Sequence, residues 1–170
     1  DTQKEQQVEI RLSLMSAEDR RPVIDLFNYY VENSFAAYPE QPMPYEFFDT
    51  LLKLTEGYPA VVAKDEGGRA VGFGFLRAHN PMPTFAQTAE IAYFIRPDCT
   101  GQGIGALMLE HLLAGAREKG LTGILAGISS LNEGSIRFHA KHGFVECGRF
   151  RGIGRKKGRL FDVVWMQRAL

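Results

Sequence analysis

The sequence has few cysteines, no net charge and no long apolar run. Its two cysteines, Cys99 and Cys147, form no Cys-x-x-Cys motif and no disulfide framework. Lys plus Arg and Asp plus Glu each count 20, so the formal net charge is zero and no overall field gathers nucleic acid or anionic lipid. No apolar run approaches the length of a membrane span. The balanced charge and the lack of a long apolar run predict a small-molecule partner, with no nucleic acid and no membrane.

The beginning of the chain, DTQKEQQVEI, also lacks the apolar core of a secretion signal, so a cytoplasmic location is expected. Hydrophobic residues make up 45% and charged residues 24% of the 170 residues, which is typical of a soluble globular protein. This length suits one domain with a substantial core. We expect a polar tail over residues 1–7 and a single domain over residues 8–170.

Hydrophobic periodicity and turn residues predict an alternation of strands and helices. Ser16 precedes Asp19 in an N-cap pattern, which predicts the start of a helix. A loop rich in proline and aromatic residues follows over residues 34–44. The predicted elements are a strand at 8–14, a helix to about 33, a helix at about 45–56, a hairpin of 60–65 and 70–78, a strand at 88–96, a helix after the glycine turn, a strand at 123–129, a helix at 132–143 and two final strands flanking GRKKGR.

The order of these elements predicts the fold class. Strand 88–96, the helix behind it and strand 123–129 make a crossover, which places the two strands parallel. Hairpins on either side of the crossover predict antiparallel pairing. The sequence therefore predicts an α/β (α+β) fold, with a mixed, mostly antiparallel sheet and helices on both of its faces.

A glycine-rich turn joins a strand to an amphipathic helix in the segment IAYFIRPDCTGQGIGALMLEHLLAGAREKG. Gly101, Gly103 and Gly105 leave backbone N–H groups free at a helix start, which is a geometry that binds phosphate oxygens. No Lys-Ser or Lys-Thr pair follows, which disfavours nucleoside-triphosphate hydrolysis. The run matches a dinucleotide fingerprint, yet TGILAGISS offers no acidic residue where that fingerprint needs one. The turn predicts an anion, and a dinucleotide-binding oxidoreductase stays a less favoured alternative.

Two segments resemble a known family. YFIRPDCTGQGIGALMLEHLL and NEGSIRFHAKHGF are similar to the GCN5-related N-acetyltransferase (GNAT) family, and the element order resembles its fold over nearly the whole chain. The stretches YYVENS, YPAVVA and FDVVWMQR look like the phosphinothricin and methionine-sulfoximine acetyltransferase branch. The resemblance implies an enzyme that transfers the acetyl group of acetyl-CoA to the primary amine of a small molecule, by direct attack in a ternary complex. A catalytically silent acyl-CoA-binding module is the second alternative.

The same resemblance assigns the cofactor site. The family motif Arg/Gln-x-x-Gly-x-Gly/Ala falls on Thr100, Gly103 and Gly105, where threonine brings no positive charge. In the family, strand 88–96 splays from its parallel neighbour, and the pantetheine arm lies in the gap against strand backbone. The N–H of Ile95 would then stabilise the thioester oxyanion. The residues implied for acetyl-CoA binding are Tyr93, Phe94, Ile95, Thr100, Gly101, Gln102, Gly103, Ile104, Gly105, Ala106, Asn132 and Ser135.

Two titratable residues are candidates for the chemistry. A substrate amine is mostly an ammonium at neutral pH, and Glu90 matches the glutamate that removes its proton in the branch. The alternative is a strand-end carboxylate in solvent or in a salt bridge. His139 matches the position of the acid that protonates the leaving thiolate, and a surface histidine is its alternative. Asn132 either contacts the pantetheine arm or only caps its helix.

The acceptor is expected between two loops, at residues 34–44 and 78–87. Phe35 and Tyr38 could form a pocket wall, and Arg77 could bind a carboxylate through two hydrogen bonds. His79 is the one basic residue of HNPMPTF, which disfavours phosphinothricin itself and leaves an amino acid or an analogue as the predicted acceptor class.

Three further features complete the predictions. His139 and His142 lie three residues apart on a helix, but no third ligand is evident, so a solvated pair and no metal are predicted. Basic residues of RFRGIGRKKGR predict a solvated hairpin turn, with contact to the cofactor's ribose phosphate or to RNA as the alternative. The apolar edge of FRGIG and LFDVVWM, together with the branch resemblance, predicts a homodimer.

Overall fold

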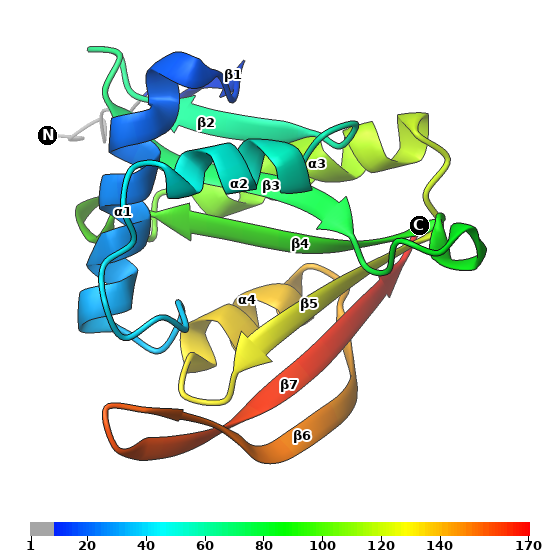
Figure 1. Cartoon of the computed structure of the whole chain (residues 1–170). Helices are drawn as coiled ribbons and strands as arrows, with labels where there is room; N and C mark the ends of the chain where they lie inside the picture. Colours follow the sequence, from blue (N-terminus) through cyan, green and yellow to red (C-terminus); the bar gives the residue numbers. More distant parts are fainter. Residues whose placement is uncertain (1–8) are drawn as a thin grey trace, which may run out of the picture.

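The computed structural model describes residues 9–170. The predicted polar tail, residues 1–7, lies outside the described residues. Over the described part, seven strands form one sheet in the order β1-β2-β3-β4-β5-β7-β6 (Figure 1). The strands are β1 Arg11–Leu14, β2 Ala60–Lys64, β3 Ala70–Ala78, β4 Thr88–Ile95, β5 Gly123–Ser129, β6 Val145–Lys156 and β7 Arg159–Ala169. The helices are α1 Arg20–Asn33, α2 Phe47–Leu54, α3 Ile104–Glu118 and α4 Glu133–Lys141.

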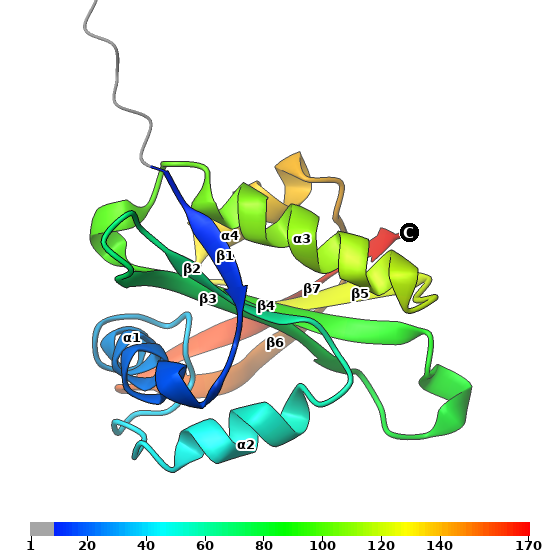
Figure 2. The ribbon, with the colours of Figure 1, turned by 90° about the horizontal axis from the view of Figure 1, so that it is seen from above.

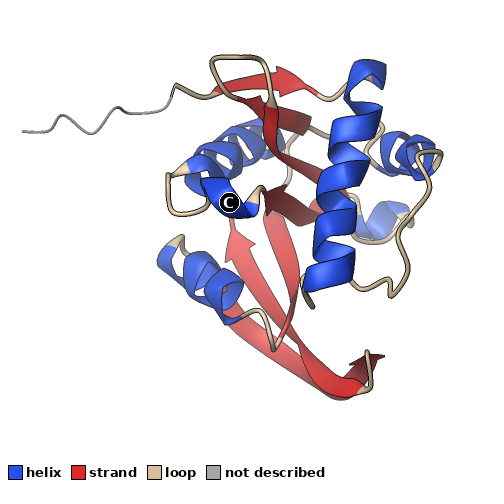
Figure 3. Ribbon diagram, turned by 90° about the vertical axis from the view of Figure 1, so that its left-hand side faces the viewer, coloured by secondary structure: helices blue, strands red, loops and turns tan. Residues whose placement is uncertain are grey.

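The predicted mixed sheet is confirmed. Within residues 9–170, β4 and β5 pair in parallel and every other strand pair is antiparallel. Helices α3 and α4 cover one face and helices α1 and α2 cover the other (Figures 2 and 3). We call these the α3 face and the α1 face.

Alternation along β4 explains why both faces are covered. Ala89 and Ile91 belong to the core cluster beneath α3, whereas Ala92 and Phe94 pack against the cluster beneath α1 and α2. Successive side chains of a strand point to opposite faces, so a strand that is apolar on both faces needs a helix layer on each side. Glu90 shares the orientation of Ala92 and Phe94, and therefore lies on the α1 face.

The boundaries of several elements differ from the predictions by a few residues. Strand β1 starts at Arg11, so it is shorter than the predicted strand at 8–14. The N-cap pattern forms as a capping box, in which the Ser16 N–H donates to Asp19 Oδ2 at 2.9 Å. The first turn behind it is a 3-10 turn at Ala17–Asp19, and α1 begins after that turn.

The C-terminal hairpin turn is exposed as predicted, and Lys156 is the exception among its basic residues. Strands β6 and β7 continue into the GRKKGR run, and only Lys157 and Gly158 form the turn, both with positive φ (50° and 73°). Lys156 is only 1% exposed, and its Nζ donates to the carbonyls of Ser34 (2.7 Å) and Ala37 (2.6 Å). The ammonium of Lys156 thus ties the hairpin tip to the loop at residues 34–44.

None of the helices between residues 9 and 170 has the length and apolar character needed to cross a membrane.

Candidate active site

Strands β4 and β5 are paired over only part of their length. Their register joins Thr88 to Gly123, Ala89 to Ile124 and Glu90 to Leu125, and goes no further. Beyond Glu90 the strands diverge (Figure 1), and residues of both strands line a cavity of about 90 Å³ that begins at Ile91. The splay implied by the family resemblance is therefore present, and Glu90 stands where it opens.

The hydrogen bonds between β3 and β4 decide which backbone groups face this gap. The Arg96 N–H donates to the Val71 carbonyl at 2.8 Å, in register with the Phe94–Phe73 pair. Hydrogen-bonded pairs alternate along antiparallel strands, so the Phe94 backbone faces β3 while those of Tyr93 and Ile95 face the gap. Phe94 can therefore contribute its side chain to the cavity but not its N–H.

The Ile95 peptide is held from the gap side by a residue that the sequence did not single out. The hydroxyl of Tyr30, on α1, donates to the Ile95 carbonyl and lines the same cavity as Ile95. This hydrogen bond fixes the orientation of the strand end that carries the predicted oxyanion donor. Tyr30 belongs to the YYVENS stretch, but the sequence did not indicate which of its two adjacent tyrosines would reach β4.

A second cavity, of about 560 Å³, opens at the glycine turn between β4, α3 and α4. Its lining contains most of the residues that the resemblance assigns to acetyl-CoA: Tyr93, Phe94, Ile95, Thr100, Gly101, Gly103, Ile104, Gly105, Ala106, Asn132 and Ser135. Gln102 is not among the lining residues and is exposed. Tyr93, Phe94, Asn132 and Ser135 line both cavities, so the two spaces adjoin.

The glycine turn presents backbone donors to the larger cavity. Gly101 and Gly103 have φ of 74° and 81°, a left-handed conformation that glycine adopts without strain. The first helical bond runs from the Leu107 N–H to the Gly103 carbonyl at 3.0 Å, so the N–H groups before Leu107 precede the helical ladder. Such a helix start carries a partial positive charge and suits an anion.

Gly105 serves a different purpose from the other two glycines. A Cβ added there would come within 3.2 Å of the Ile95 side chain and 3.4 Å of Phe138. The absence of a side chain therefore lets α3 approach β4 and α4 closely.

The structure offers a cation for the charge that Thr100 lacks. The Thr100 hydroxyl donates to the Pro97 carbonyl at 3.1 Å, so its proton is already used. Lys141, on α4, lines the same cavity. The helical spacing of Gly134, Phe138 and Lys141 could have predicted this position, because it places all three on one face of α4.

His139 is buried, which rules out the surface-histidine alternative. It is 3% exposed, and its Nδ1 lies 2.7 Å from the Ser135 carbonyl and 3.2 Å from the Ser135 hydroxyl. Its Nε2 lies 2.5 Å from the Tyr93 hydroxyl. A carbonyl only accepts hydrogen bonds, so Nδ1 carries a hydrogen, and in the neutral ring Nε2 accepts from Tyr93.

The electrostatics of this pair favour its neutral form. Burial lowers the pKa of His139 below its ordinary value, although the Ser135 carbonyl partly opposes that shift. Burial raises the pKa of Tyr93. The predicted solvated His139–His142 pair is therefore wrong for His139. Among residues 9–170, no three His, Cys, Asp or Glu side chains gather as metal ligands would.

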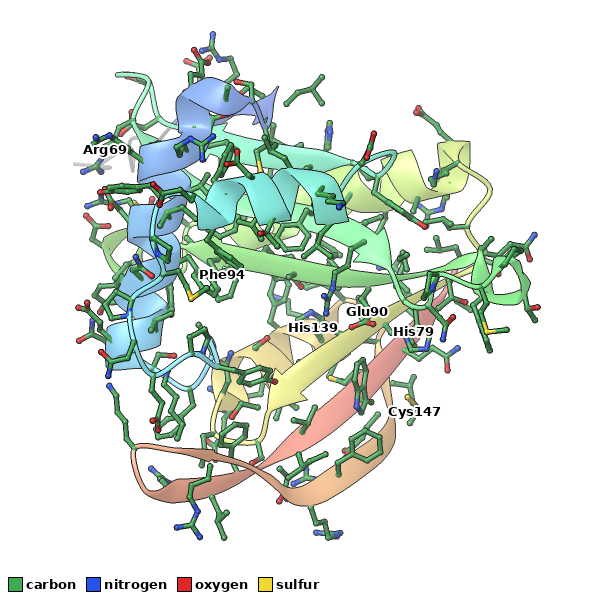
Figure 4. All side chains as sticks on the ribbon, viewed as in Figure 1. Arg69, His79, Glu90, Phe94, His139 and Cys147 are labelled. Carbon is green, nitrogen blue, oxygen red and sulfur yellow. The ribbon has the colours of Figure 1, made fainter. Side chains whose placement is uncertain are left out.

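Glu90 lies on the opposite face of β4 from His139, beside His79 (Figure 4). Its Oε1 is 3.4 Å from Arg77 Nη2, and its Oε2 is 3.0 Å from His79 Nδ1. The salt bridge named as the alternative for Glu90 therefore exists. Glu90 is the last residue of β4 that pairs with β5, and neither Glu90 nor Arg77 is among the residues that line the two cavities.

The aromatic residues predicted for the acceptor pocket pack elsewhere. Phe35 and Tyr38 contact Phe161 of β7, with ring centroids 6.0 and 5.6 Å apart. Neither is among the residues that line the two cavities, whereas Ala36 of the same loop lines both. The structure thus brings Arg77 to Glu90, and it uses Phe35 and Tyr38 to hold the loop against the sheet.

Asn132 is confirmed as the N-cap of α4, and its contact with the pantetheine arm stays a prediction. Its side chain accepts from the Ser135 N–H at 3.3 Å, which caps α4. It also lines both cavities.

Comparison with known proteins gives consistent matches. The sequence model of the acetyltransferase (GNAT) family matches residues 23–144. The chain is 33% identical over 157 residues to a phosphinothricin N-acetyltransferase of Streptomyces coelicolor, covering 90% of this chain and 92% of the relative. It is 33% identical over 149 residues to an L-methionine sulfoximine/L-methionine sulfone acetyltransferase of Pseudomonas aeruginosa, covering 85% and 86%.

A solved structure has the same fold. The phosphinothricin acetyltransferase of Sinorhizobium meliloti, determined in complex with acetyl-CoA, superposes with a TM-score of 0.89 at 30% identity. The match covers 96% of this chain and 89% of that one.

Proposed function

Because the chain belongs to the GNAT family of acetyltransferases, in its phosphinothricin and methionine-sulfoximine branch, we propose that its acceptor is the α-amine of an amino acid or an analogue. The protein is an acetyl-CoA-dependent N-acetyltransferase. The alternative of a dinucleotide-binding oxidoreductase is therefore dropped. The observation that carries the acceptor proposal is the Arg77–Glu90 pair, which offers a carboxylate partner and an ammonium partner at the mouth of the gap.

The donor side is built mainly from backbone. The N–H groups at the start of α3 and the Lys141 ammonium suit the pyrophosphate of acetyl-CoA. In the gap, the Tyr93 and Ile95 peptides are oriented to bond the pantetheine arm as a strand would. The Ile95 N–H then stabilises the negative charge that develops on the thioester oxygen.

The acceptor reaches the thioester from the α1 face. Glu90 accepts a proton from the substrate ammonium, directly or through a water, and the free amine attacks the acetyl carbon. Donor and acceptor approach from opposite faces of the sheet, so both fit at once. We therefore propose direct transfer in a ternary complex, with no acetylated enzyme.

His139 acts on the leaving thiolate through Tyr93. The proton comes from the imidazolium, which burial makes the minor form: its Nδ1–H stays on the Ser135 carbonyl and its Nε2–H faces the Tyr93 oxygen. The Tyr93 proton is then free for the sulfur, and His139 replaces it. This assigns the acid role to the pair, with the hydroxyl as the group nearest the cavities.

A thiol-release assay tests the function. Acetyl-CoA is supplied with a panel of L-amino acids, and initial rates are measured over a grid of both substrates. Intersecting double-reciprocal lines are expected for a ternary complex. Parallel lines would indicate an acetyl-enzyme instead, and no turnover with any amino acid would remove the proposed acceptor class.

Residues 8–170 are proposed to form one domain that pairs as a homodimer in the cytoplasm. Strand β6 is an edge strand, and exposed apolar side chains cluster on the β6–β7 hairpin: Val145, Phe150, Ile153 and Leu160. Light scattering at working concentration tests this assembly. A monomer mass would refute the dimer and leave the chemistry unaffected.

A further inference from the structure

Strand β4 has an open edge beyond Glu90, and a side chain from α1 occupies part of it. The pairing of β4 with β5 ends at Glu90, so the gap-facing peptide groups of Ile95 lack the partners that a continuing strand would supply. The Tyr30 hydroxyl donates to the Ile95 carbonyl, and thus takes the place of a backbone N–H from β5. The Ile95 N–H, on the same edge, has no such partner among residues 9–170.

Aromatic packing holds the Tyr30 ring where its hydroxyl reaches this edge. The ring centroid lies 5.4 Å from that of Phe94, which also packs on Phe27 at 5.5 Å. Phe27 and Tyr30 are three residues apart and therefore share one side of α1. Burial raises the pKa of the Tyr30 hydroxyl, so its proton stays on the oxygen at neutral pH. Within residues 9–170, the bond to Ile95 is the one hydrogen bond that this hydroxyl makes.

The two polar groups of Ile95 would have opposite effects on a thioester in the gap. The N–H stabilises the negative charge that develops on the thioester oxygen, whereas a bare carbonyl repels it. A bare carbonyl would also accept from an amide N–H of the pantetheine arm, which would shift the thioester along the strand. A hydroxyl bound to that carbonyl reduces both effects.

We infer that Tyr30 is a positioning residue for acetyl transfer, which occupies the Ile95 carbonyl so that the thioester oxygen meets the Ile95 N–H. This rests on the proposed function, in which that N–H is the oxyanion donor. Tyr30 acts through the Ile95 peptide, so its effect falls on the chemical step more than on acetyl-CoA binding.

The experiment compares Tyr30→Phe with the wild type. Phenylalanine keeps the packing on Phe94 and removes only the hydroxyl. kcat should fall by roughly tenfold, less than the 10²–10³ that follows deletion of an oxyanion donor. The acetyl-CoA Kd, measured by calorimetry, should change by no more than about threefold, the scale of one neutral hydrogen bond.

Isotope-edited infrared spectroscopy supplies a readout that a merely structural effect would not move. Acetyl-CoA labelled with ¹³C at the acetyl carbonyl is bound without an acceptor. In the wild-type complex the carbonyl stretch should lie at a lower frequency than in solution, because the Ile95 N–H polarises the carbonyl. In Tyr30→Phe the stretch should move back towards its solution value.

Tyr29→Phe is the matched control. Tyr29 is the neighbouring tyrosine of α1, is 41% exposed and is not among the residues that line the two cavities. This variant should keep the wild-type kcat and the wild-type carbonyl stretch.

An unchanged kcat or an unchanged carbonyl stretch in Tyr30→Phe, or equal changes in Tyr29→Phe, would overturn the inference while leaving the Ile95 N–H as the oxyanion donor. A wild-type complex in which the stretch equals its solution value would overturn the oxyanion assignment of the proposed function, and this inference with it.

Discussion

The two faces of the sheet are built by different means. On the α3 face, the proposed donor site consists mainly of glycines, a helix start and strand peptides between β4 and α3, to which α4 adds Asn132 and Lys141. On the α1 face, the proposed acceptor side depends on side-chain contacts between different strands, such as Arg77 with Glu90. A site made of backbone groups, which binds the same donor throughout, can be encoded by a short stretch of sequence. A site made of side chains can change its acceptor specificity by substitution without altering the donor site.

The largest expected effect comes from the α1 face. Glu90→Gln keeps the shape of the side chain but removes the basic carboxylate, so kcat should fall by roughly 10² to 10⁴ at neutral pH. Acetyl-CoA binding, measured by calorimetry, should stay normal. The lost activity should return as pH rises towards the pKa of the substrate amine. Full activity at neutral pH would remove Glu90 from the mechanism.

The next effect tests the α3 face. Gly103→Val should weaken acetyl-CoA binding by at least about tenfold, because the side chain enters the cavity and disfavours the left-handed turn. Gly120→Val is the matched control, since Gly120 has the same φ of 81° but does not line the cavity. If both variants bind acetyl-CoA like the wild type, the glycine turn is not the pyrophosphate site.

A third experiment asks whether Tyr93 and His139 act as one unit. Tyr93→Phe and His139→Gln should each lower kcat by roughly tenfold, with the double variant no worse than either, since residues of one relay are non-additive. Acetyl-CoA affinity should change little. Losses that multiply in the double variant would show independent roles.

Lys156→Met should have a smaller effect, through the loop at residues 34–44, whose Ser34 lines the larger cavity and whose Ala36 lines both cavities. Removing the ammonium frees the carbonyls of Ser34 and Ala37 and loosens the loop, so the acceptor KM should rise roughly threefold, equivalent to a lost hydrogen bond. Lys53→Met, at an exposed position of α2, is the control. Unchanged KM values in Lys156→Met would show that the loop keeps its position without the Lys156 ammonium.

The smallest effect concerns pH and stability. Because burial lowers the pKa of His139, the unfolded chain takes up a proton first as pH falls below the ordinary histidine value of about 6.5. The corresponding part of the unfolding free energy is complete above that pH and is lost below it. Denaturant unfolding at several pH values should show a steeper acid loss in the wild type than in His139→Gln. Parallel curves would indicate that His139 titrates alike in both states.

The sequence was a good guide to the α3 face and a poor one to the α1 face. Gly101, Gly103 and Asn132 belong to motifs whose spacing defines their geometry, so their places in the cavity could be predicted. Lys156 contacts Ser34 and Tyr30 contacts Ile95 across long sequence separations. Hydrophobic periodicity does not predict such contacts. Phe35 was expected in a pocket wall because aromatic residues often form one, but packing on Phe161 satisfied the same apolar surface.

Strand order also bears on how the enzyme is made. β7 lies between β5 and β6, although it follows both along the chain. While a ribosome has released the chain only as far as the β6–β7 turn, β5 presents an unpaired edge and β6 lacks its partner. Phe161, which packs against Phe35 and Tyr38, has not yet left the ribosome at that point either. The nascent chain can therefore form its glycine turn early, and it becomes competent for an acceptor only after β7 has been synthesised.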